Sequence, residues 1–217
     1  SEKNPYYSSV DGVLYNKEQT ELLACPKQKK ICNMPDTVTN VNENALKDYD
    51  TQLEELYISD GITEMTKWVK GENLKKIQIG KNVKEIALAD ITLRNLEQIT
   101  VSEENQTYKL QDHMLYTKDG SKLIWCPAKK SGTVTICDGT SSIGGYAFGY
   151  AKKITQINIP ATVKTIEPKA FYGLAKAAGH DEKNSTLPVG TYSEEAKTAI
   201  RTMLGLQEMY EWYKNQT

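Results

Sequence analysis

The chain has 217 residues and a formal net charge of −1, from 27 basic and 28 acidic side chains. This nearly equal number of basic and acidic side chains predicts no electrostatic attraction to nucleic acid or to an anionic membrane. Apolar residues make up 39% of the chain, an ordinary share for a soluble globular protein, and they form no run of about 18 that could span a membrane.

The chain opens on a module that recurs 101 residues later. Residues 4–26 contain Asn-Pro-Tyr-Tyr, then Asp-Gly-Val-Leu-Tyr, then Leu-Leu-Ala-Cys-Pro, and residues 105–127 repeat the pattern. In the second copy Asp119-Gly120 lies between two apolar segments, which is a strong signal for a β-hairpin. We therefore expect one hairpin at the N-terminus, where it caps the open end of the fold, and one in the middle of the chain.

A shorter phrase recurs about every 22 residues between and after these modules. In its clearest copy, residues 154–166, Ile157 and Ile159 alternate with polar residues and Pro160 follows. The residue equivalent to Ile159 falls at positions 34, 58, 79, 101, 136 and 159. Alternation predicts a short strand, the proline predicts a turn, and the period predicts a solenoid whose equivalent strands pair in parallel. The second hairpin accounts for the one long interval between copies, from position 101 to position 136.

The repeated pattern ends after residue 173. Residues 174–191 are typical of a loop, and Thr191-Tyr-Ser-Glu194 offers a capping box before apolar residues at helical spacing. We expect residues 1–173 to form the solenoid and residues 174–217 to add a loop and a C-terminal capping helix to the same domain.

The phrase and the module together resemble the BspA-like leucine-rich repeats of bacterial surface proteins. The phrase supplies apolar anchors, a proline, Val-x-x-Ile and Ala-Phe, and the module supplies the pattern of residues 11–26. The copies beginning at 53, 74 and 96 lack Ala-Phe, and residues 174–217 lie outside the resemblance. Over residues 4–173 it implies a leucine-rich-repeat-like right-handed solenoid of mostly short parallel strands, with inserted β-hairpins and a C-terminal helix. It also implies an exported, often surface-attached chain that binds proteins or other macromolecules.

Strand alternation predicts which side chains point away from the core of such a solenoid. The outward row should consist of Asn33, Tyr57, Gln78, Thr100, Thr135 and Asn158, flanked by Ile31, Glu55, Lys76, Gln98, Thr133 and Gln156. The row is polar and nearly uncharged, with one aromatic residue, so it suits hydrogen bonding to a protein or a glycan better than to nucleic acid. The alternative is a solvated sheet face without a ligand.

The sequence offers little for catalysis. Its two histidines are His113 and His180, and it contains no phosphate-binding loop, GxSxG elbow or HExxH helix. Cys126 and His113 could form a nucleophile pair across one hairpin. The first module, however, has Cys25 at the equivalent position and Gly12 in place of the histidine, which favours a packing role for the cysteine. We expect no enzyme activity, no cofactor and no metal.

The four cysteines leave three interpretations open: buried free thiols, one or two disulfides, or a metal site. Alternation places Cys32 inside the solenoid and Cys137 outside, where it would be a reactive thiol or half of a disulfide.

These observations favour a monomeric, non-enzymatic, adhesin-like interaction module of a bacterial surface or secreted protein. Its ligand would be a protein or a glycan, with host molecules among the candidates, and its export signal would already be removed. The alternative is a carbohydrate-binding or scaffolding piece of a surface assembly.

Overall fold

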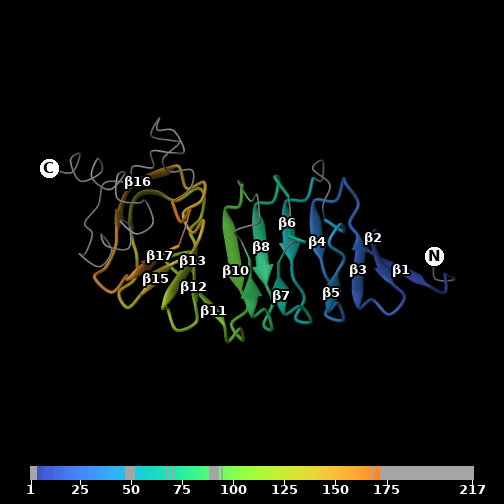
Figure 1. The fold of residues 1–217 in the computed structure, drawn as a ribbon. Helices are drawn as coiled ribbons and strands as arrows, with labels where there is room; N and C mark the ends of the chain where they lie inside the picture. The colour runs from blue at the N-terminus through green and yellow to red at the C-terminus, as the bar shows by residue number, and fades with distance from the viewer. Residues whose placement is uncertain are drawn as a thin grey trace. The chain divides into compact units, whose positions relative to one another are not determined.

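The computed structural model describes residues 4–46, 52–66, 68–69, 71–87, 93, 95–167 and 169–171. The chain divides into two compact units, Ser1–Tyr108 and Lys109–Thr217. Every regular element among the described residues is a β-strand (Figure 1). The expected capping helix at 174–217 lies outside the described residues.

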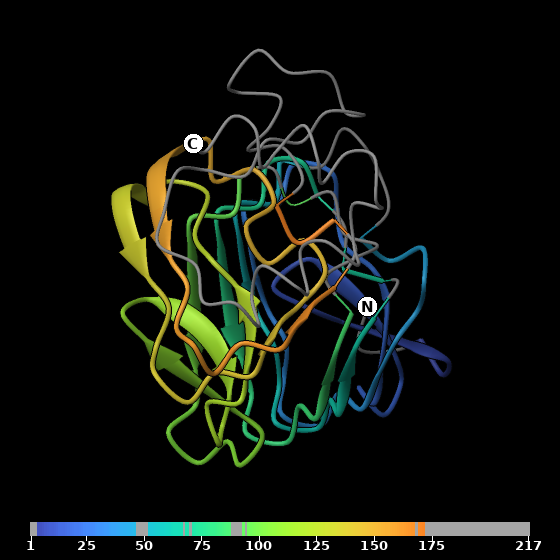
Figure 2. The same cartoon turned by 60° about the vertical axis from the view of Figure 1, so that its left-hand side comes forward.

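The first unit is a stack of parallel strands, as the repeat predicts. Its main sheet has the order β10-β8-β6-β4, and these strands lie side by side in Figures 1 and 2. Shorter strands follow the main strands along the chain, and β7 and β9 pair with each other in parallel. The main strands are β4 (Ile31–Asn33), β6 (Glu55–Tyr57), β8 (Lys76–Ile79) and β10 (Gln98–Val101), and the short ones are β5 (Asn40–Val41), β7 (Glu64–Met65) and β9 (Glu85–Ile86).

The apolar anchors of the phrase form the core of this stack. Leu56, Ile77 and Ile99 occupy one register position on three neighbouring strands, and all three are buried. Cys32 occupies the same position on β4 and is fully buried, which confirms its predicted inward direction. Each buried Leu or Ile side chain contributes about 1.5–3 kcal/mol relative to solvent, and a coil gains this only when a neighbour covers it.

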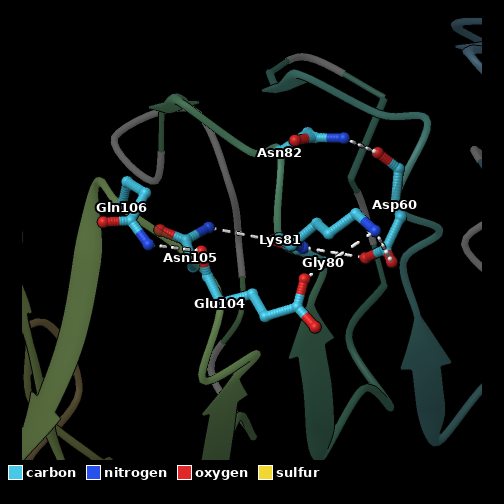
Figure 3. Close-up of polar contacts among 7 residues, drawn as sticks. All are labelled: Asp60, Gly80, Lys81, Asn82, Glu104, Asn105 and Gln106. Carbon is cyan, nitrogen blue, oxygen red and sulfur yellow. Dashed lines mark hydrogen bonds and ion pairs between the residues drawn. The ribbon is translucent and has the colours of Figure 1, made fainter.

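The turns after the main strands are bonded from one coil to the next (Figure 3). The Lys81 backbone N–H donates to Asp60 Oδ1 at 2.9 Å, and the Asn82 side chain donates to the Asp60 carbonyl at 2.7 Å. Turns this close leave no room for a side chain at Gly80, because a Cβ there would lie 2.5 Å from the carbonyl oxygen of Ser59. A side chain at position 80 would therefore push these two turns apart.

The N-terminal module is a three-stranded antiparallel meander, so the expected hairpin at 4–26 was one strand short. Its strands are β1 (Tyr7–Val10), β2 (Val13–Asn16) and β3 (Glu21–Ala24), and β3 also pairs in parallel with β5. Asp11 and Gly12 join β1 to β2 with φ angles of +50° and +81°, which suit the mirror-image turns of two-residue hairpins. The strand missing from the hairpin prediction is β1, which this turn joins to β2.

The second unit begins with the other copy of the meander. Its five-stranded sheet has the order β11-β12-β13-β15-β17, and β14 pairs in parallel with β16. The strands are β11 (Tyr108–Gln111, starting at the last residue of the first unit), β12 (Met114–Thr117), β13 (Lys122–Trp125), β14 (Ser131–Thr135), β15 (Ser142–Ile143), β16 (Lys153–Asn158) and β17 (Thr165–Ile166). The two Ala-Phe pairs close their coils as expected, since the rings of Phe148 and Phe171 stack at 5.4 Å between centroids.

The predicted outward direction of Cys137 is wrong. Cys137 is half-buried and packs against the apolar core of the second unit, where its backbone N–H donates to the Tyr116 hydroxyl at 3.4 Å. The strand β14 ends at Thr135, so period-two alternation no longer applies two residues later. All four cysteines are free thiols in this structure.

Candidate interaction surface

The main sheet of the first unit presents the predicted outward residues in two aligned rows. Parallel register places Asn33, Tyr57, Gln78 and Thr100 at equivalent positions of neighbouring strands. The flanking row, two residues earlier on each strand, consists of Ile31, Glu55, Lys76 and Gln98. The structure thus brings together eight of the residues that the sequence singles out.

Tyr57 lies at the centre of a bonded cluster on this face. Its hydroxyl donates to Glu55 Oε2 at 2.6 Å and accepts a hydrogen bond from Lys76 Nζ at 3.0 Å. The Lys76 ammonium also lies 5.0 Å from the centroid of the Tyr57 ring and 3.7 Å from the Glu55 carboxylate. Three side chains from two strands therefore hold one aromatic ring in a fixed orientation.

The charges of this cluster cancel. The hydrogen bond to Tyr57 is the main cause that raises the pKa of Lys76, with the negative charge of Glu55 a smaller one. A lysine whose pKa lies above its ordinary value stays protonated at neutral pH, so the positive charge of Lys76 faces the acidic side chain of Glu55, 3.7 Å away. The cluster is thus polar but neutral, which favours neither a nucleic acid nor a strongly charged ligand.

The residues around the cluster differ in what they offer a ligand. Asn33 and Gln78 are exposed, and Ile31 is 48% exposed, which adds an apolar contact beside Glu55. Thr100 departs from the expectation because its hydroxyl is buried and makes no hydrogen bond to the described part of the protein. In the outward row of this unit, Asn33 and Gln78 are therefore exposed, whereas Tyr57 and Thr100 are half-buried.

The second unit presents a shorter stretch of the same kind on β14 and β16. Thr135 pairs with Asn158, and Thr133 pairs with Gln156. The Gln156 side chain donates to Asn158 Oδ1 at 3.0 Å, and Asn158 donates in turn to Thr135 Oγ1 at 3.1 Å. The predicted row of six is thus a stretch of four in the first unit and a stretch of two in the second.

The proposed nucleophile pair lacks an activated thiol. Burial raises the pKa of Cys126 to about 12, so its thiol is protonated at neutral pH and is a poor nucleophile. His113 lies in the β11–β12 turn at a φ of +62°, where the first module has Gly12. In the part of the chain that the structure describes, no three His, Cys, Asp or Glu side chains are placed to hold a metal ion.

Sequence reasoning named the members of the Tyr57 cluster but not the bonds that join them. A usable signal was present: Glu55 and Tyr57 stand two residues apart on one strand, and Lys76 follows 21 residues after Glu55, one coil later. In a parallel stack these positions are neighbours on one sheet face, so their charges and the ring should meet.

The repeats match a family described as BspA type leucine rich repeat region, in six copies over residues 24–119 and 126–192. The chain belongs to this family. Leucine-rich repeats of this type are generally non-catalytic scaffolds that mediate protein interactions. No described helix of this BspA type repeat protein is long and apolar enough to cross a membrane.

Two solved structures are similar to this BspA type repeat protein. A leucine-rich repeat protein from Eubacterium ventriosum is 26% identical, with a TM-score of 0.54, over 67% of this chain and 45% of its own. The pneumococcal vaccine antigen PcpA is 15% identical, with a TM-score of 0.50, over 88% of this chain and 60% of its own, and this likeness shows the fold alone. The chain therefore spans less than two thirds of either relative. A search of the curated proteins found no match.

Proposed function

We propose that this protein is a non-enzymatic, extracellular, adhesin-like module that binds a partner protein on the outward face of β4, β6, β8 and β10. Family membership supports a bacterial surface or secreted protein, because BspA type repeats are typical of such proteins. The remaining question is which residues would contact the partner.

One observation carries the proposal: the Tyr57 ring is fixed in place before any ligand arrives. Glu55 and Lys76 restrain the ring through its hydroxyl and its face, so little side-chain entropy is lost on binding. Aromatic residues with few freely rotating bonds are common anchors of protein interfaces. The exposed Ile31 on the neighbouring strand widens the apolar contact.

The same cluster favours a protein over a glycan. A sugar usually stacks on an open aromatic face, and here the Lys76 ammonium lies over the Tyr57 ring. A carbohydrate ligand would have to displace that ammonium and break its hydrogen bond to Tyr57. A peptide chain could instead use the carboxylate, the ammonium and the amides of Asn33 and Gln78 as they stand.

The test compares Tyr57→Ala with Tyr6→Ala, which removes an exposed tyrosine of the same unit outside the main sheet. Purified proteins are assayed by surface plasmon resonance against extracellular-matrix and serum proteins of the host, and on a glycan array. For the partner that binds, we expect Tyr57→Ala to weaken affinity at least about 10-fold and Tyr6→Ala to change it less than about twofold.

Two outcomes would count against this function. Equal affinity of the Tyr57→Ala variant and the unmodified protein would move the interface away from the sheet face. Binding to glycans alone, lost with Tyr57→Ala, would favour a carbohydrate-binding module.

A further inference from the structure

The two meander modules have the same local structure. Asn4 Oδ1 accepts hydrogen bonds from the backbone N–H groups of Tyr6 and Tyr7 at 2.8 and 3.0 Å. Asn105 Oδ1 accepts from the equivalent N–H groups, those of Thr107 and Tyr108, at 2.8 Å each. Each asparagine therefore starts its module with the same side-chain turn.

The same lysine–aspartate contact closes both modules. Lys29 bonds the carbonyl and the carboxylate of Asp11, and Lys130 bonds the carbonyl and the carboxylate of Asp112. Two pieces of chain with matching turns and matching contacts should dock on their surroundings in the same way.

In the second copy the start of the module is bonded to a preceding coil of the first unit. The Asn105 amide nitrogen donates to the carbonyl oxygens of Gly80 at 2.9 Å and Val83 at 3.1 Å (Figure 3 shows the bond to Gly80). The Tyr108 hydroxyl donates to the Lys84 carbonyl at 3.0 Å. Asn105 is fully buried and Tyr108 is 6% exposed.

In the first copy the equivalent face is open to solvent. Asn4 is exposed, and Tyr7, the counterpart of Tyr108, is 48% exposed. Tyr6 is 74% exposed and Leu14 is 39% exposed. Ser9 pairs with Leu14 and stands two residues after Tyr7, so Tyr7 and Leu14 share one face of the β1–β2 pair. Three large side chains, those of Tyr6, Tyr7 and Leu14, are therefore exposed on a module whose Asn4 accepts the same two backbone hydrogen bonds as Asn105.

We propose that the face formed by Asn4, Tyr6, Tyr7 and Leu14 is a docking surface for a further leucine-rich-repeat coil of the same polypeptide, ahead of residue 4. That coil would offer Asn4 two turn carbonyls, as Gly80 and Val83 offer theirs to Asn105, and a third carbonyl to the Tyr7 hydroxyl. The N-terminal module is then a connector between two stacks of coils rather than the end cap that the sequence predicts.

The connection between module and coil identifies the occupant. β10 pairs with β8, and β8 ends just before Gly80. A turn at Ser102–Asn105 follows β10 and leads into the module, and this brings Asn105 to the turn of Gly80. A second copy of the protein docked on the first module would not supply that leading strand, whereas a covalently preceding coil would. This chain also spans only 45% of the similar Eubacterium ventriosum protein, so relatives with further sequence exist.

The experiment compares the full natural polypeptide with the 1–217 chain by tyrosine nitration with tetranitromethane, read by mass spectrometry. We expect Tyr6 and Tyr7 to react readily in the 1–217 chain. In the full polypeptide, Tyr7 should react at least about fivefold more slowly, close to the rate of the buried Tyr108. Equal nitration of Tyr7 in both proteins would overturn the proposal, as would a natural sequence without a coil before residue 4. Concentration-dependent protection within the 1–217 chain would overturn it by showing a second copy on this face.

A pair of substitutions gives an independent measurement. In the full polypeptide, Asn4→Ala and Tyr7→Ser should each lower Tm by roughly 4 °C or more, because each removes a contact that is buried there. In the 1–217 chain the same substitutions should lower Tm by less than about 2 °C, because Asn4 loses only the bonds of its exposed turn and Tyr7 is already half exposed to water. Equal shifts in the two proteins would contradict the docking surface.

Discussion

Asn105→Ala should be among the most destabilising polar substitutions in this protein. The side chain donates to the carbonyls of Gly80 and Val83 and accepts from the N–H groups of Thr107 and Tyr108. Alanine leaves two carbonyls beside a fully buried site without their donor, at about 1–3 kcal/mol each, and the loosened turn adds about 1 kcal/mol. We expect a loss of about 3–7 kcal/mol, a large part of the stability of an ordinary domain.

Urea unfolding followed by circular dichroism at 25 °C measures this loss, and Asn4→Ala in the 1–217 chain is the matched control. Asn4 makes the same turn but is exposed, so its replacement should cost less than about 1 kcal/mol. Equal urea midpoints for the two variants would show that the bonds to the preceding coil do not stabilise the protein.

Asn105→Asp separates the donor role of the side chain from its acceptor role. Aspartate keeps the acceptors but turns a carboxylate toward the carbonyl oxygens of Gly80 and Val83, which should raise its pKa in the folded protein above the ordinary value of about 3.9. A carboxyl whose pKa is raised by folding is tolerated while it is protonated in both states. The penalty should therefore be smallest below about pH 4 and should grow as the pH rises above it. A penalty that did not change between pH 3.5 and 7 would contradict this account.

Three further substitutions or reactions test other parts of the fold. Gly80→Ala should cost about 1–3 kcal/mol in urea unfolding, because its Cβ would overlap a carbonyl of the preceding coil; an unchanged midpoint would show that the turn relaxes freely. His113→Gly should stabilise the protein by about 0.5–1 kcal/mol, because a φ of +62° strains any residue with a Cβ. A loss of stability would instead show that a contact of the imidazole stabilises the fold. Cys25 should react with iodoacetamide at pH 7.5 well before Cys126, because a hydrogen bond from Cys32 lowers the pKa of Cys25 while burial raises the pKa of Cys126 to about 12. Mass spectrometry measures the order of alkylation, and faster reaction of Cys126 would contradict these two pKa shifts.

The stack of coils was predictable because its determinants are local and repeated. Leu56, Ile77 and Ile99 recur at a nearly constant spacing, and a period of that length can bury them only by stacking. Parallel register then follows, and with it the alignment of Glu55 with Lys76 and of Tyr57 with Gln78. The parts of the candidate surface that depend on strand alternation were therefore available from the sequence.

Other features were not predictable because they depend on where a strand ends or on partners far along the chain. The alternation that placed Cys137 outward stops at Thr135, and a sequence pattern does not mark that boundary. The first turn of the second meander is hidden because His113 occupies a position where glycine would have signalled it. The bonds of Asn105 join residues 22 and 25 positions apart, and no local pattern reveals them.

The burial of Asn105 also bears on how this protein can be produced. Residues 105–107, Asn-Gln-Thr, form an acceptor sequence for N-linked glycosylation, which in a eukaryotic secretory pathway acts on the chain before it has folded. A glycan on this fully buried side chain could not fit between the module and the turn of Gly80. Material secreted from yeast or mammalian cells would then carry a modification that prevents the coil-to-module contact from forming, whereas bacterial expression leaves the asparagine free to make it.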